Sequence, residues 1–352
     1  MIVYILRRLI WGVVVAVGLT FITFAVFRLI PYNPGYILAG PKATPDQLRV
    51  ADHKLGVDVD IWTQYGRFLG RLVHGDLGTS FTGEHINPVI AATLPVTGLL
   101  VVGGMLIMLA MALPLAVLSA RRAGSAIDQL VLAVSVLGIA MHPFVVGVVL
   151  KQIFGVHLGI LPLGGYCPMH HVGPSHGEPG SFLTPSQLSA EAHGGATCAG
   201  SPWPWLWLSH MILPSLTFAF FFLPFYVRIL RTRLVESYAE PWVNVARAKG
   251  ASEFRIVIRH LLRVVAGTTA AMLALDIGTA VTASIYIETI YNLPGLGHLA
   301  LTALGANSFT ESGYDLPTMA AIVLIVAVTI VVLNLLADLV AKRLDPRIKL
   351  SS

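Results

Sequence analysis

Six long apolar stretches constrain this chain more than any other feature of its sequence. They lie near Leu9–Ile30, Val96–Ala120, Ile127–Phe154, Leu208–Leu230, Ala266–Ile287 and Thr318–Val340. About 20 residues, each rising about 1.5 Å, are enough to cross the hydrocarbon core of a bilayer as a helix. Prolines inside these stretches, such as Pro143 and Pro214, are expected to be tolerated because neighbouring helices satisfy the freed backbone groups. We therefore predict an all-α polytopic membrane protein with six transmembrane helices in a single domain, residues 1–352.

The composition excludes the soluble classes of protein. Of the 352 residues, 55% are hydrophobic and only 12% are charged, and the mean hydropathy is +0.76. A soluble domain carries about 25% charged residues. The net charge of +5 would suggest nucleic acid as the partner of a soluble protein. In a membrane protein basic residues first report topology, so we expect membrane lipid and no nucleic acid around this chain.

The distribution of Lys and Arg predicts the orientation of the chain. Sixteen of the 23 basic residues precede span one, follow span two, separate spans four and five, or follow span six. Five lie in the first loop on the opposite side, and the other two loops of that side hold none. Because cytoplasmic loops hold the excess of Lys and Arg, both termini are predicted to be cytoplasmic. The first apolar stretch is too long for a typical signal peptide, and we expect it to stay as an anchor.

Residues 31–94 form a long loop on the predicted outer side. Within it, apolar residues recur at steps of three to four from Ile61 to Val73, which is typical of an amphipathic helix. Such a helix would lie along the membrane surface, cover the mouth of a pathway, or simply pack as an extracellular helix.

Residues 155–207 form an expanded second outer segment, rich in Gly, Pro, Ser and His, that contains both cysteines of the chain. Because the exterior is oxidising, we predict a disulfide bond between Cys167 and Cys198. The alternative is a metal or haem site built from Cys167, His170 and His171. Their spacing matches no standard zinc pattern, so we expect no metal site.

Several polar residues lie where lipid would penalise them, and such residues usually face a bundle interior or a water-filled cavity. His142, Asp276 and Glu288 are candidates for lining a pathway. Asp276 is the deepest of the polar residues within the spans. The equally plausible alternative is that its carboxylate is hydrogen-bonded to a neighbouring helix.

Residues 236–264 form the only sizeable element on the predicted cytoplasmic side. The stretch from Glu240 to Ala248 is typical of a helix, and Gly250 suits the left-handed position that follows a helix end. Ser252 then caps a second helix. The small residues around Gly250 would let the backbone of another protein approach closely, so this helix–turn–helix has the form of a docking surface.

The second helix of this element carries two kinds of side chain at helical spacing. Arg255, Arg259 and Arg263 form a basic stripe. Phe254, Val257, Ile258 and Leu261 are predicted to form its apolar face.

The sequence contains no nucleotide-binding or hydrolytic motif. The dipeptide Gly-Lys does not occur, so there is no P-loop, and HExxH, GxSxG and CxxC are also absent. We therefore expect no enzymatic activity and no cofactor in this chain. If ATP drives the protein, ATP and Mg belong to separate subunits.

Four stretches carry a resemblance to one family. They are the start Tyr4-Ile5-Leu6-Arg7-Arg8-Leu9, the outer segment Gly75-Asp76-Leu77-Gly78-Thr79-Ser80 with Leu55-Gly56 before it, the loop Ala246-Arg247-Ala248-Lys249-Gly250, and Glu288-Thr289-Ile290-Tyr291-Asn292-Leu293-Pro294-Gly295 with the ending Leu344-Asp345-Pro346-Arg347. In this order they resemble the inner-membrane permease subunits of bacterial ABC importers of the dipeptide/oligopeptide and nickel class. The outer segment around 160–205 is not part of that pattern, and Pro241 replaces an acid common in the family.

The resemblance implies one half of a type I importer in the bacterial cytoplasmic membrane. It implies a second, similar permease, two ATP-binding subunits and an extracytoplasmic substrate-binding protein as partners. The expected substrates are di- and oligopeptides, with nickel chelates or haem as alternatives. The residues that would couple to the ATPase are Glu240, Ala246, Arg247, Ala248, Lys249, Gly250 and His260.

Two other classes are weighed against this interpretation. A secondary transporter that runs on an ion gradient often carries internal repeats, and the first and second three spans show no similarity. A membrane metalloenzyme would need the outer His and Cys residues to stand at defined spacing as ligands of a metal ion.

Overall fold

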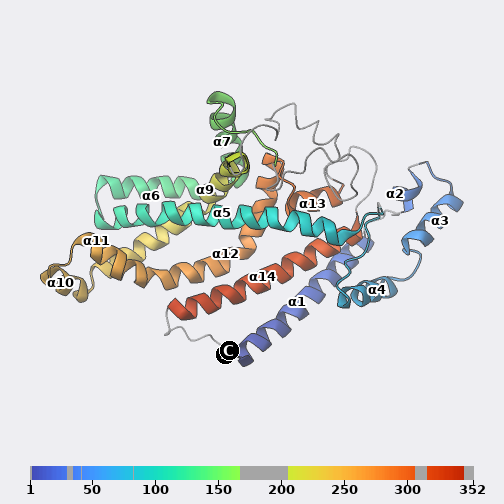
Figure 1. Ribbon diagram of the computed structural model, residues 1–352, viewed down its shortest axis with the longest axis horizontal. Helices are drawn as coiled ribbons and strands as arrows, with labels where there is room; N and C mark the ends of the chain where they lie inside the picture. The colour runs from blue at the N-terminus through green and yellow to red at the C-terminus, as the bar shows by residue number, and fades with distance from the viewer. Residues whose placement is uncertain are drawn as a thin grey trace. The chain divides into compact units, whose positions relative to one another are not determined.

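The computed structural model describes residues 2–29, 35–40, 42–81, 83–166, 205–305 and 315–344, and these are almost entirely helical (Figure 1). They fall into two compact units. The first unit is built from residues 2–97 and 294–332, and the second from residues 98–166, 205–293 and 333–344, each with the gaps given above.

The first unit is assembled from helices at the two ends of the chain. These are α1 (Ile2–Leu29), α2 (Gly35–Ala39), α3 (Pro45–Leu55), α4 (Ile61–Val73), the beginning of α5 (Ile86–Arg121), α13 (Leu296–Ala303) and most of α14 (Leu316–Leu344). Its core joins Phe24 of α1, Phe68 of α4 and Ala320 of α14. A Cβ on Gly12 would lie 2.6 Å from Val331 Cγ1, so this glycine permits α1 to approach α14 closely.

The amphipathic helix predicted from Ile61 to Val73 is confirmed as α4. Asp60 caps it by accepting a hydrogen bond from the Thr63 backbone N–H at 3.2 Å. Helix α4 packs against α1, and its position relative to a membrane surface or to the mouth of a pathway stays a prediction. Tyr65 is buried, and its ring lies edge-on to that of Phe24 of α1 with centroids 5.4 Å apart.

The second unit contains the remainder of α5, followed by α6 (Ala126–Ile139), α7 (Pro143–Leu150), the π-helix η1 (Lys151–His157), α9 (Trp205–Tyr238), α10 (Pro241–Ala248), α11 (Glu253–Ile256), the π-helix η2 (Val257–Leu261) and α12 (Leu262–Tyr291). Helix α9 packs against α6, α7 and α12. A Cβ on Gly104 of α5 would lie 2.4 Å from the Phe218 ring of α9, so these two helices are also in close contact.

The described residues contain five candidate membrane spans, and a sixth if one bent helix pair counts as a span, which corrects the prediction in one place. Five helical stretches are each long and apolar enough to cross a membrane: Leu6–Val26, Ile86–Arg121, Trp207–Tyr238, Glu253–Tyr291 and Leu316–Leu336. The sixth, predicted as one helix over Ile127–Phe154, is instead a pair, α6 and α7–η1, bent by 107°. At about 1.5 Å per residue α6 is only about 21 Å long, too short to cross the hydrocarbon core alone.

Proline chemistry explains the break between α6 and α7. Pro143 has no N–H, and its ring disfavours a helical conformation in the residue before it. His142 is accordingly extended, with ψ 143°, and α7 begins at Pro143. Pro214 and Pro224 remain inside the continuous helix α9 as predicted, so only the proline at 143 was misjudged.

Candidate coupling surface

The helix–turn–helix predicted within residues 236–264 is present, at one end of α9 and α12 (Figure 1). Glu240 is the residue before α10, and Pro241 occupies the first helical position, where a missing N–H costs nothing. Because Pro241 fits this position, the departure from the family pattern leaves the local helix intact.

The turn after α10 is closed by two backbone hydrogen bonds around Gly250. The Gly250 N–H donates to the Arg247 carbonyl at 2.9 Å, and the Ala251 N–H donates to the Ala246 carbonyl at 3.1 Å. This pair of bonds is a Schellman motif, which requires a left-handed residue after the helix end. Gly250 has φ +78°, as the sequence predicted, and nothing lies within 4 Å of where a Cβ would be.

Side chains on the two sides of the turn hold it together. Ser252 caps α11 by accepting a hydrogen bond from the Arg255 N–H at 3.4 Å. Arg247 Nε donates to Glu253 Oε1 at 2.7 Å, and this bond raises the pKa of the Arg247 guanidinium. Arg247, expected to contact the ATPase, therefore also bridges α10 and α11 within the chain.

His260 lies within the same element and contacts the ring of Trp242, with centroids 5.8 Å apart. Ala248 and Lys249 are exposed beside Gly250, and Ala246 is half-buried. The predicted coupling residues are thus gathered on α10, its turn and η2.

The predicted apolar face of the second helix is divided between buried and exposed side chains. Val257 and Leu261 are buried, whereas Phe254 and Ile258 are 74% and 50% exposed. Val245 of α10 is also exposed, at 53%. Only one side of this helical stretch packs against the rest of the chain. The wider turn of the π-helix η2 also changes the spacing at which residues share a face.

These three exposed apolar side chains, Val245, Phe254 and Ile258, are called the apolar trio below. The sequence grouped Phe254 and Ile258 with Val257 and Leu261 in one apolar face and did not distinguish exposed from buried members. The signal available was Phe254 and Ile258 at i, i+4, the spacing of neighbours on one helix face. Arg255 and Arg259, in the same helical stretch as Phe254 and Ile258, are exposed as well, so both apolar and basic side chains are exposed there.

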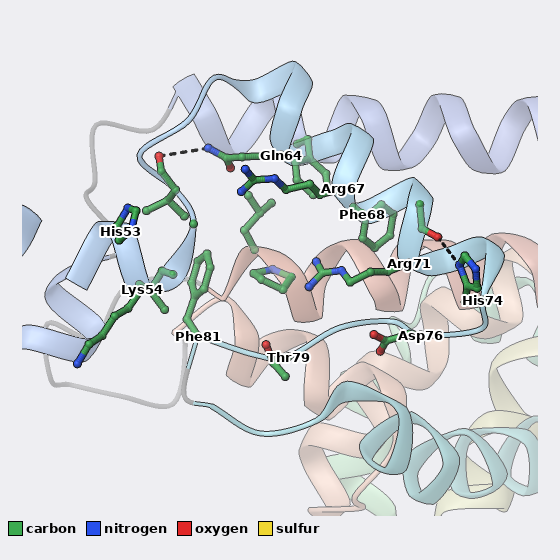
Figure 2. Close-up of a pocket in the computed structure, with 17 residues that line it drawn as sticks. His53, Lys54, Gln64, Arg67, Phe68, Arg71, His74, Asp76, Thr79 and Phe81 are labelled. Atoms are coloured by element: carbon green, nitrogen blue, oxygen red, sulfur yellow. Dashed lines mark hydrogen bonds between the residues drawn. The ribbon is translucent and has the colours of Figure 1, made fainter. Parts of the chain in front are cut away.

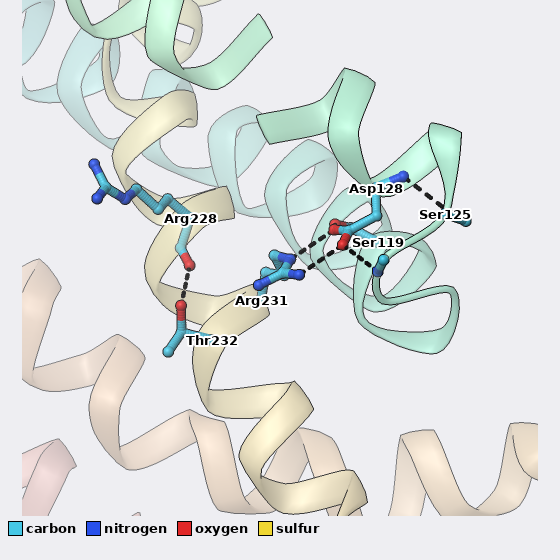
Figure 3. Close-up of polar contacts among 7 residues, drawn as sticks. Ser119, Ser125, Asp128, Arg228, Arg231 and Thr232 are labelled. Atoms are coloured by element: carbon cyan, nitrogen blue, oxygen red, sulfur yellow. Dashed lines mark hydrogen bonds and ion pairs between the residues drawn. The ribbon is translucent and has the colours of Figure 1, made fainter. Parts of the chain in front are cut away.

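Helix α9, which leads into α10, is held to α6 by a paired ionic contact (Figure 3). Arg231 Nε and Nη2 each donate to a carboxylate oxygen of Asp128 at 2.6 Å. The Ser119 hydroxyl and the Gly124 N–H donate to the same carboxylate. The Asp128 side chain is 2% exposed and that of Arg231 19%. In the sequence, Arg231 was used only as one of the basic residues that indicate topology. Asp128 was not singled out, although it is an acid in an otherwise apolar stretch.

A second polar contact joins α9 to α12, the helix that follows the turn. Tyr226 Oη donates to Asp276 Oδ2 at 2.8 Å, and Tyr226 is fully buried. Asp276 therefore has the helix-to-helix hydrogen bond that the sequence left open as the alternative to lining a pathway.

The other two proposed pathway residues occupy different surroundings. His142 caps α7 by accepting a hydrogen bond from the Phe144 N–H at 3.2 Å, and its exposed ring meets that of Tyr286 edge-on, with centroids 4.7 Å apart. Glu288 is fully buried. Asp276 and Glu288 are about 18 Å apart along α12, since each residue adds about 1.5 Å. The three residues do not form one cluster.

Cys167 and Cys198 lie outside the described residues, so their disulfide stays a prediction. Within the described ranges, no three His, Cys, Asp or Glu side chains are grouped so as to hold a metal ion.

Candidate spans, with a helix–turn–helix between two of them, are the architecture of a polytopic membrane protein. The chain belongs to the family of binding-protein-dependent transport system inner membrane components. The model of that family matches residues 112–350, and the model of its N-terminal part matches residues 1–100. It is therefore a multi-pass protein of the cytoplasmic membrane and not an enzyme. Membrane components of such systems act with ATP-hydrolysing and substrate-binding partners.

Curated relatives match over almost the whole chain. The probable D,D-dipeptide transport system permease protein of Escherichia coli is 32% identical over 346 residues, which are 98% of this chain and 97% of that protein. The dipeptide transport system permease protein of Escherichia coli is 31% identical, covering 99% of both chains. The oligopeptide transport system permease protein of Bacillus subtilis is 29% identical, covering 98% of this chain and 99% of that protein.

Proposed function

We propose that this chain forms half of the translocation path of an ATP-driven importer of di- and oligopeptides. Full-length similarity to permeases named for dipeptide and oligopeptide transport supports this substrate class. Neither these relatives nor the described residues favour nickel chelates or haem. A second homologous permease would supply the other half of the path, and a substrate-binding protein would deliver the peptide from outside.

The proposal assigns the α10–η2 element to the docking of an ATP-binding subunit, one of two in the complex, which would carry ATP and Mg. The observation that carries this assignment is the apolar trio. Phe254 is exposed by 74% outside the packed core, and burial of such a side chain against a partner stabilises a complex by about 1.5–3 kcal/mol. Arg255 and Arg259 beside it would meet acidic groups of a partner and fix the orientation.

The attachments of α9 and α12 suggest how docking is transmitted. The turn connects these two helices, and the Tyr226–Asp276 hydrogen bond joins them again within the bundle. A displacement of the turn therefore reaches two long helices at once. The ion pair between Arg231 and Asp128 extends that displacement to α6.

A matched pair of substitutions tests the docking surface. Val245→Ser removes one member of the apolar trio, and Val73→Ser makes the same change at an 85% exposed position of α4. Phe254→Ser removes a larger apolar side chain of the same trio than Val245→Ser does. After affinity purification of the assembled complex, we expect Phe254→Ser to weaken ATP-binding-subunit retention roughly 10- to 150-fold, from about 1.5–3 kcal/mol. Val245→Ser should weaken it less, and Val73→Ser should leave it unchanged.

Peptide uptake in cells should fall in the same order as subunit retention. Full retention of the ATP-binding subunit by Phe254→Ser and Val245→Ser would contradict the proposed docking surface. Uptake of nickel or haem, but not of peptide, by the intact complex would contradict the proposed substrate class.

A further inference from the structure

A cavity of about 850 Å³ lies within the first unit (Figure 2). It is bounded by the end of α3, by α4, by the segment from Asp76 to Phe81 and by the first residues of α14. Phe24, Phe68 and Phe81 give it an apolar wall, and Arg67, Arg71 and Lys54 bring positive charge.

The two arginines stand on one side of α4, four residues apart. Figure 2 shows their guanidinium groups directed into the space that Phe81 faces. In the part of the chain that the structure describes, no carboxylate forms an ion pair with Arg67, Arg71 or Lys54. The one acid of the lining, Asp76, accepts a hydrogen bond from the Gly78 N–H at 2.8 Å.

The backbone at Gly78 leaves room for the Arg71 side chain. Gly78 has φ +91°, and a Cβ there would lie 3.1 Å from Arg71 Cζ. The glycine thus lets the guanidinium lie against the backbone of this segment. His74 does not compete for a ligand through Nδ1, because that atom lies 3.0 Å from the Gly70 carbonyl oxygen.

The cavity lies at the level where candidate spans end. Phe24, in its wall, belongs to the span Leu6–Val26, and Leu316, also in its wall, begins the span Leu316–Leu336. Trp62 of α4 is 68% exposed and stacks on Phe21 at 5.4 Å between centroids. Exposed tryptophans at span ends are typical of the membrane–water interface.

We propose that this cavity binds the phosphate of an anionic phospholipid headgroup, held by the guanidinium groups of Arg67 and Arg71 with Lys54 nearby. Guanidinium groups match phosphate oxygens with two parallel hydrogen bonds. Free inorganic phosphate shares this chemistry. The interfacial depth and the phenylalanine wall, which suits the start of an acyl chain, assign the phosphate to a lipid.

The test is native mass spectrometry of the full-length chain in detergent, titrated separately with phosphatidylglycerol, phosphatidylcholine and inorganic phosphate. The double variant Arg67→Gln/Arg71→Gln removes both guanidinium groups, and both substitutions are at exposed positions. Lys42→Gln/Arg49→Gln removes the same charge from exposed residues that do not line the cavity. We expect phosphatidylglycerol to bind the wild-type chain in preference to phosphatidylcholine. Its affinity should fall at least about tenfold in the first double variant and stay unchanged in the second.

Circular dichroism should show equal helix content in both double variants, and Arg67→Lys/Arg71→Lys should restore part of the binding. Equal phosphatidylglycerol affinity in the two Gln double variants would overturn the proposed site. Binding of inorganic phosphate without phosphatidylglycerol would overturn the assignment to a lipid. Neither result would bear on the docking of an ATP-binding subunit.

Discussion

Substitutions at Gly250 separate the folding of the turn from its contact with a partner. The residue has φ +78°, and none of the described residues lies within 4 Å of the position that a Cβ would take. Gly250→Ala therefore costs only the left-handed conformation, about 1 kcal/mol, and Gly250→Asn costs less because asparagine tolerates this region. Gly250→Trp should destabilise the free chain about as much as Gly250→Ala, since Gly250 is exposed.

A partner groove would distinguish these variants sharply. If the turn lies within van der Waals distance of an ATP-binding subunit, the tryptophan ring overpacks the contact, at a cost of about 1–3 kcal/mol or more. That corresponds to a loss of affinity of roughly 5- to 150-fold. Co-purification of the ATP-binding subunit should therefore follow the order wild type, Gly250→Asn, Gly250→Ala and, far below, Gly250→Trp. Ala248→Trp should behave like Gly250→Trp.

Gly75→Trp is the matched control. Gly75 has φ +76°, it is exposed, and nothing lies within 4 Å of its Cβ position either. Gly75 lies in the segment predicted to be outside. The substitution Gly75→Trp should therefore leave co-purification of the ATP-binding subunit unchanged. Retention of the ATP-binding subunit and of peptide uptake by Gly250→Trp would refute the argument that this turn is the coupling element.

Three further predictions concern the bundle and its topology. Asp128→Ala should lower the free energy of unfolding by about 3–5 kcal/mol in denaturant titrations, because it leaves Arg231 without its carboxylate; adding Arg231→Met should recover part of this loss. Cysteine labelling at Ser351 and at Ser186, in a background without native cysteines, should occur from opposite sides of the membrane, and labelling of both from outside would reject the predicted orientation. The two native cysteines should resist alkylation until the protein is reduced, as measured by intact mass.

Features encoded locally in the sequence could be predicted well. The amphipathic spacing of α4 and the glycine at the end of α10 each depend on a few neighbouring residues. The serine cap at Ser252 is of the same kind. The positions of the candidate spans could also be predicted from the apolar stretches, because the thickness of the bilayer fixes the length of a span.

Features that depend on distant contacts could not be predicted in the same way. The pairing of Asp128 with Arg231 joins residues 103 positions apart, and nothing in either local sequence specifies it. The break at Pro143 could not be distinguished from the tolerated Pro214, because the difference depends on how neighbouring helices pack. Phe254 fits a helical apolar pattern equally well whether that face packs inside the chain or against another subunit.

Photo-crosslinking from position 254 tests the central claim most directly. A benzoylphenylalanine in place of Phe254 keeps an aromatic side chain at the most exposed member of the apolar trio. The same group in place of Val73 serves as the control. In the assembled complex, illumination should link position 254 to an ATP-binding subunit and should not link position 73 to it. The absence of this crosslink from position 254, in a complex that still imports peptide, would contradict the account.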